Sequence, residues 1–223
     1  MSSFVDSGET IYRIPAGSEL TAPTWTQTIS LTTPSIGSYI LVFVVGTATS
    51  VTCSGATMTQ LASLSGTYPI KAYGGLCLST GVQTITIKGD RGVLCGAHAL
   101  AFDHCVAELA ASQVTEAALS VTPNNNSDMY VDCVVETWAT STLSSTLTAG
   151  AGQTKRTQLN YGGFWNYPTT PATYPPASNV SYKTSSTADT MAWTFSQAAT
   201  GGAHLVMRLI PYSPFVGRGT IIQ

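Results

Sequence analysis

Apolar and polar residues alternate along most of this chain with a period of two residues. In residues 190–196, for example, Met191, Trp193 and Phe195 fall on one face, with polar or small residues between them. Strict alternation is typical of strands that bury one face of a sheet. Residues 39–45 are continuously apolar, which predicts a central strand buried on both faces. Further alternating segments are 25–31, 82–88, 128–138 and 204–211.

Turn residues separate these segments. Pro34 and Gly37 precede the apolar run, and the pair Ser54-Gly55 follows residues 51–53. Many short strands with frequent turns predict an all-β protein, an antiparallel β-sandwich with a jelly-roll-like topology. Helical spacing competes only in residues 106–119, where one short helix is possible.

The chain shows no internal repeat of fixed period and no linker, so we expect one sandwich domain over residues 25–211. Residues 1–24 have little periodicity and are expected to form an N-terminal arm, and residues 212–223 a C-terminal tail. Residues 160–176 are rich in aromatic residues, Pro and Gly and predict a long loop within the domain.

Composition narrows the choice of partners. Charged residues make up only 9% of the chain, against about 25% in an average globular domain, while Ser and Thr make up roughly a quarter. The net charge is −2, and nine Lys and Arg residues are scattered, which argues against a nucleic-acid partner. The first residues lack the features of a signal peptide, and the longest apolar run cannot span a bilayer. We therefore expect synthesis in a cytoplasm and no membrane partner.

Five cysteines occur at irregular spacing. An odd number without a secretion signal predicts free thiols buried as small apolar side chains, not a disulfide framework. The cysteines are Cys53, Cys77, Cys95, Cys105 and Cys133.

One segment has Cys and His residues at a spacing that could indicate a metal site. They are Cys95, His98, His104 and Cys105. On one extended strand, however, the two histidines face opposite to the two cysteines, so four ligands cannot converge. We expect no metal or other cofactor here, with the cysteines in the core and the histidines at a strand edge or an interface.

Three carboxylates and one Asp-His pair are the remaining candidates for catalysis. Asp128, Asp132 and Glu136 alternate with apolar residues, but positions four apart on a strand are about 13 Å apart, too far for a glycosidase pair. We expect these carboxylates on a solvated or interface face. Asp103 and His104 are adjacent, and neighbours on a strand face opposite ways. With no nucleophile-elbow motif either, the sequence predicts a protein that is not an enzyme.

The aromatic loop at 160–176 holds the candidate contact residues. Tyr and Trp supply large rigid contact surfaces and concentrate in interface hot spots. The loop could dock a protein partner, stack against glycans beside Asn160 and Asn166, or fold over the end of its own sandwich. The candidate residues are Tyr161, Phe164, Trp165, Tyr167 and Tyr174.

Several segments resemble a β-sandwich module of bacteriophage virion proteins and related bacterial surface proteins. Residues 37–45 (GSYILVFVV) are similar to its central strand, and residues 51–61 (VTCSGATMTQL) to its hairpin, with Ala56 in place of a glycine. The other segments that resemble the module are 81–87, 149–156 (AGAGQTKR), 192–194 and 204–209. The resemblance implies a sandwich fold and a role in a virion.

On this basis we expect a structural protein of a bacteriophage particle, such as a capsid cement or decoration subunit. Its partners would be other copies of itself, as a homotrimer, and a major capsid or other virion protein. The N-terminal arm and the tail at 212–223 could reach such neighbours. The first alternative is a tail or appendage adhesin that binds host-surface glycans. The second is an enzyme that acts on glycans.

Overall fold

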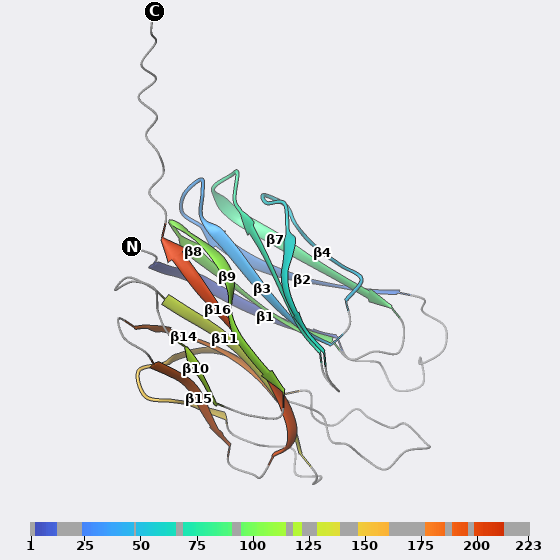
Figure 1. Ribbon diagram of the computed structural model, residues 1–223. Helices are drawn as coiled ribbons and strands as arrows, with labels where there is room; N and C mark the ends of the chain where they lie inside the picture. The colour runs from blue at the N-terminus through green and yellow to red at the C-terminus, as the bar shows by residue number, and fades with distance from the viewer. Residues whose placement is uncertain are drawn as a thin grey trace, which may run out of the picture.

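The computed structural model in Figure 1 is built from strands. It describes residues 3–12, 24–46, 48–65, 69–90, 95–114, 118–121, 129–138, 147–160, 177–185, 189–195 and 199–211. Within these residues there are sixteen strands and no helix, which confirms the predicted all-β class. Among these residues we find no helix with the length and hydropathy needed to cross a membrane.

The first eight strands form two sheets that face each other. A five-stranded sheet has the order β1-β8-β3-β6-β5, and a three-stranded sheet has the order β2-β7-β4. We call these strands the first unit. They are β1 (Ser3–Tyr12), β2 (Thr24–Thr33), β3 (Tyr39–Gly46), β4 (Ser50–Cys53), β5 (Thr59–Leu64), β6 (Ile70–Leu76), β7 (Gly81–Asp90) and β8 (Cys95–Asp103).

The remaining eight strands, the second unit, form another pair of sheets. Their orders are β13-β14-β11-β16-β9 and β10-β15-β12. Neighbouring strands are antiparallel in all four sheets. The strands are β9 (Cys105–Val114), β10 (Ala118–Val121), β11 (Met129–Trp138), β12 (Leu147–Ala149), β13 (Thr154–Asn160), β14 (Ala177–Thr184), β15 (Asp189–Phe195) and β16 (Ala199–Pro211).

The strand order of the second unit repeats that of the first. Numbered from its own start, each unit has the order 1-8-3-6-5 in the larger sheet and 2-7-4 in the smaller one. The order 1-8-3-6 opposite 2-7-4 is that of a jelly roll, with the fifth strand moved beside the sixth. Thr-Gln-Leu occurs in both β5 and β13, and Leu61 and Leu159 both pack against the core between the units.

The four sheets stack as four layers, with the two five-stranded sheets in the middle (Figure 1). The core between these two sheets, the central core, includes Leu41, Phe43, Val131 and Leu205. Separate cores fill the space between each five-stranded sheet and the three-stranded sheet of its own unit. Each middle sheet is therefore covered on both faces.

This layering explains the pattern of β3. Tyr39, Leu41, Phe43 and Val45 face the central core, and the residues between them face the core of the first unit. All eight residues of β3 are buried, so the predicted central strand is confirmed. By contrast β2, in an outer sheet, buries Trp25, Ile29 and Leu31 and exposes the threonines between them, as its alternation predicts.

The structure differs from the sequence-based predictions in three places. Residues 3–12, expected to belong to an arm, form β1 and pair with β8 along its full length. The possible helix at 106–119 is instead occupied by β9 and the start of β10. The expected single sandwich consists of two units of equal topology that share one core, although the sequence shows no regular repeat.

Because the central core is common to both units, truncating one of its large side chains should weaken the whole molecule. We predict that Phe43→Ala lowers the free energy of unfolding by about 3–5 kcal/mol, measured by urea denaturation. The exposed residue Ser30 on β2 is the control, and Ser30→Ala should change stability by less than about 0.5 kcal/mol. A Phe43→Ala protein as stable as the control would contradict the assigned core.

Candidate functional site

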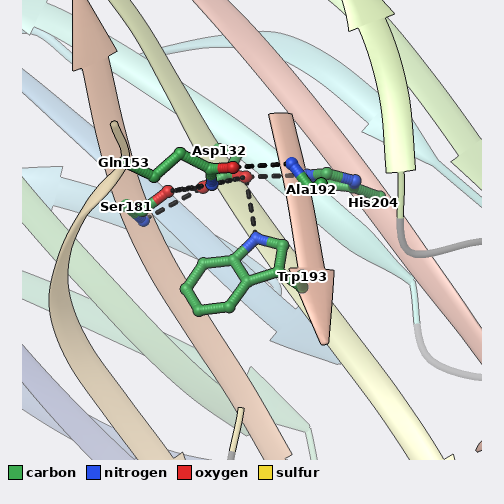
Figure 2. A network of polar contacts seen from close by, with 6 residues as sticks. All are labelled: Asp132, Gln153, Ser181, Ala192, Trp193 and His204. Atoms are coloured by element: carbon green, nitrogen blue, oxygen red, sulfur yellow. Dashed lines mark hydrogen bonds and ion pairs between the residues drawn. The ribbon is translucent and has the colours of Figure 1, made fainter. Parts of the chain in front are cut away.

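The carboxylate of Asp132, on β11 in the centre of its sheet, is the centre of a buried polar network. Its Oδ1 accepts hydrogen bonds from the Ser181 amide at 3.0 Å and the Ser181 hydroxyl at 2.6 Å. Its Oδ2 lies 2.8 Å from both Nε1 of Trp193 and Nε2 of His204. The Gln153 amide donates to the same oxygen at 3.4 Å (Figure 2). We call these five residues the Asp132 network.

Two neighbouring strands of the same sheet, one strand of the outer sheet and one turn complete this network around β11. Ser181 on β14 is the direct cross-strand partner of Asp132, and His204 on β16 lies on the same face. Trp193 comes from β15 in the outer sheet. Gln153, in the turn before β13, also accepts from the backbone amide of Ala192 on β15 at 2.6 Å. The network therefore fastens the outer sheet of the second unit to the sheet beneath it.

The network has no counterpart on the matching strand of the first unit, where β3 presents only Ile40, Val42 and Val44 to its outer sheet. A buried carboxylate is costly unless several donors surround it, and here every donor is supplied from within the unit. Its arrangement also differs from a nucleophilic triad. Ser181 and His204 both contact Asp132, whereas a triad needs the serine to contact the histidine.

The expectation of a solvated or interface face for Asp132 and Glu136 was wrong. Both side chains are buried, at 0% and 1% exposure. The reason is the outer sheet, which covers this face of β11 with Met191 and Trp193 of β15 and Leu147 of β12. Asp128, the third of the candidate carboxylates, lies outside the described residues.

His98 is a second buried polar group, and it links the two units. Its Nδ1 lies 2.6 Å from the Thr157 hydroxyl and its Nε2 2.7 Å from the Ser178 hydroxyl. Burial lowers the pKa of His98 to about 3, so the ring is neutral. Glu9 on β1 also hydrogen-bonds to Thr157, and burial raises the pKa of this carboxyl. The expected edge position was wrong for His98, because β8 lies between β1 and β3.

His104 lies in the turn between β8 and β9 and has a positive φ of 55°. This turn breaks the strand, so Nδ1 of His104 contacts the carboxylate of Asp103 at 2.9 Å although the two are neighbours. His104 therefore lies partly exposed in a turn, whereas His98 is fully buried. In the described part of the chain, no group of three or more His, Cys, Asp or Glu side chains is placed to hold a metal ion.

The cysteines Cys77, Cys105 and Cys133 are free and buried, as predicted, and Cys53 is free and half-buried. Burial, aided by the nearby Cys53, raises the pKa of the Cys77 thiol to about 11. Cys77 and Cys133, whose pKa is also raised by burial, therefore remain protonated and serve as core side chains. The side chain of Cys95 lies outside the described residues.

The three most exposed of the large apolar side chains in the described residues lie at one end of the first unit, together with Leu76. Ile36, Leu78 and Val82 are 71%, 75% and 69% exposed, and Leu76 is 39% exposed. We call these four residues the apolar end.

Backbone hydrogen bonds hold the two loops of the apolar end together. The Gly37 amide donates to the Cys77 carbonyl at 2.8 Å, and the Cys77 amide to the Ser38 carbonyl at 2.7 Å. Gly37 has a φ of 87°, which favours glycine. Residues 33–38 and 76–83 include no charged residue. Sequence reasoning missed this surface, although apolar residues within predicted turns were a signal for it.

The predicted contact residues Tyr161, Phe164, Trp165, Tyr167 and Tyr174 lie outside the described residues. The described residues next to them are Asn160 at the end of β13 and Ala177 at the start of β14, which pair with each other. The aromatic segment therefore begins and ends at one edge of the middle sheet of the second unit. Its role as a contact surface stays a prediction.

Comparison of the chain with models of known families, with curated proteins and with solved structures finds no match. The segments that resemble the virion module are divided between the two units. Residues 37–45, 51–61 and 81–87 lie in the first unit, and residues 149–156, 192–194 and 204–209 lie in the second. The resemblance thus rests on these short motifs alone.

Removing the Asp132 carboxylate should leave several buried donors without an acceptor. We predict that Asp132→Ala lowers the free energy of unfolding by about 3–5 kcal/mol in urea denaturation. Asp189, which forms a surface ion pair with Lys183 at 2.7 Å, is the matched control. Asp189→Ala should cost less than about 1 kcal/mol. Equal effects of the two substitutions would show that the Asp132 network contributes little to the free energy of unfolding.

His98 should make stability fall in acid. Its pKa is about 3 in the native state, below the ordinary value of 6.5, so the unfolded chain takes up a proton first as the pH falls. The contribution of His98 to the free energy of unfolding is complete above pH 6.5. It is lost between pH 6.5 and about 3, by up to about 1.4 kcal/mol per pH unit. Urea denaturation from pH 7.5 to 4 should therefore show a steeper decline for the wild type than for His98→Gln. Parallel profiles would contradict the assignment.

Proposed function

We propose that this chain is a non-enzymatic structural protein of a bacteriophage particle, a capsid cement or decoration subunit that joins its neighbours through repeated protein contacts. The observation that carries the proposal is the apolar end, with three side chains at least 69% exposed in segments 33–38 and 76–83, which contain no charged residue. Exposed apolar clusters on a soluble protein mark interaction sites.

The physical properties of the apolar end suit a protein interface. Its loops are tied together by backbone hydrogen bonds and linked through the Ser35 and Ser38 hydroxyls to the carboxylate of Asp103. A surface that is already ordered loses little conformational entropy when a partner binds. Residues 33–38 and 76–83 carry no charge of their own, so a partner has few ions to desolvate there.

Low charge over the whole chain supports the same role. With only 9% charged residues, a large share of the surface consists of hydroxyl and small side chains. Such surfaces can pack closely in many copies without accumulating unpaired buried charge. Weak contacts repeated around a particle then give strong overall attachment through multivalency. A homotrimer that also contacts a major capsid protein is the form of assembly we propose.

Self-association through the apolar end can be measured directly. We predict that the wild-type chain forms oligomers whose mass rises with concentration in light scattering coupled to size exclusion. Ile36→Ser combined with Leu78→Ser should weaken this association about tenfold or more, because each removes a large apolar contact. The control is Thr28→Ala combined with Thr84→Ala, at two exposed positions of the outer sheet.

Two results would count against the proposal. A wild-type chain that stays monomeric at every concentration would remove self-assembly through any surface. Oligomers that are equally stable with and without the Ile36 and Leu78 side chains would remove the apolar end as the contact. In that second case, Trp165→Ala tests whether the predicted aromatic loop provides the contact instead.

A further inference from the structure

The strand β9 forms an open edge of the middle sheet of the second unit. It pairs with β16 on one side, and no described strand pairs with its other side. Five of the seven residues from Glu108 to Val114 are exposed and the other two are half-buried. The apolar side chains of Leu109 and Val114 are 47% and 42% exposed. Both faces of this half of the strand therefore reach the surface.

The matching strand of the first unit is protected. β1 also lies at the edge of its sheet, but the ten-residue strand β2 runs beside it. The Thr32 amide donates to the Asp6 carboxylate at 2.7 Å, and the Thr10 hydroxyl donates to Gln27 at 3.1 Å. In the second unit the strand in the place of β2 is β10, described over Ala118–Val121. Most described residues of β1 are half-buried, whereas most residues from Glu108 to Val114 of β9 are exposed.

β9 has few of the charged residues and prolines that usually keep edge strands apart, although its pairing with β16 shifts register between Leu109 and Ala111. Natural edge strands carry lysines, prolines or inward-pointing charges that oppose pairing with another chain. Between Cys105 and Val114 the only charged residue is Glu108, and its carboxylate is engaged by Arg208 on β16. Ala110 and Ser112 are exposed and small, so their side chains present little steric hindrance to a strand pairing beside them.

We propose that residues 108–114 of β9 pair antiparallel with the same segment of a second copy of this chain. A two-fold axis through the strand pair would join the two five-stranded sheets into one continuous sheet. Self-pairing suits this strand because it carries a single charge, so like charges oppose each other only if the axis passes through Glu108. The inference rests on the proposed assembly function and names one of its contacts.

This contact is expected to be weak by itself. Seven residues of an antiparallel strand extend over about 24 Å, which gives an interface at or below the small end of stable complexes, about 1,200 Å² in total. Pairing should therefore depend on protein concentration in the purified chain. It would become stable in an assembly where other contacts hold the copies together.

The test combines hydrogen exchange with light scattering on the full chain. At high concentration, the backbone amides of residues 108–114 should exchange more slowly than at low concentration. Ala110→Lys combined with Ser112→Lys places four positive charges around the two-fold axis and should weaken association about tenfold or more. The control adds the same charge to another exposed edge strand, β5, as Gln60→Lys with Ser63→Lys, and should leave association unchanged.

The outcomes separate this inference from the proposed function. If the wild-type chain associates but residues 108–114 exchange equally at both concentrations, the β9 pairing is overturned and assembly through another surface stands. If β9 is protected and the substitutions at Ile36 and Leu78 have no effect, the pairing stands and the apolar end is overturned as the contact. A wild-type chain that is monomeric throughout overturns both.

Discussion

The packing of two five-stranded sheets against each other is the constraint on which the rest of the structure depends. Each of these sheets has one face toward the central core and the other toward its own outer sheet. The strands in the middle of each sheet are therefore buried on both faces, and β3 is apolar on both. The hydroxyl-rich, weakly charged surface is left to the outer sheets, the loops and the sheet edges.

Polar residues in the middle layers then have to find partners within the protein. His98 contacts the hydroxyls of Thr157 on β13 and Ser178 on β14 across the central core, and these contacts link the two units. Asp132 faces the outer sheet of the second unit, and its carboxylate contacts Ser181 on β14, Trp193 on β15 and His204 on β16. Both groups are sealed from solvent, so their physical role is to fix how the layers fit together. Among the described residues, the apolar end and the edge of β9 are the surfaces we propose for a partner.

The sequence predicted the strands better than it predicted their surroundings. Alternation identified β2, β7, β11, β15 and β16 because each has one face that is consistently apolar. It placed Asp132 toward solvent because alternation cannot distinguish water from a distant strand, and Trp193 lies 61 residues further along the chain. β1 was missed because its residues are mostly half-buried and follow no apolar period.

The repeated topology was hidden for a related reason. The two units preserve which positions face inward but not the residues there, so Val42 on β3 and Asp132 on β11 both face an outer sheet. Gly-Ala-His occurs in both β8 and β16, yet His98 faces the central core while His204 contacts Asp132 on the other face. This tripeptide therefore does not mark matching positions. The strand order is what reveals the repeat.

The central claim, that the chain assembles through uncharged surfaces, is tested most directly by sedimentation velocity over a concentration series at low and high salt. We predict species heavier than the 23.3 kDa monomer at rising concentration, with association as strong or stronger in high salt. Apolar and backbone contacts are not screened by ions, whereas ion pairs are. A single 23.3 kDa species at every concentration, or complexes that dissociate as salt is added, would contradict the account.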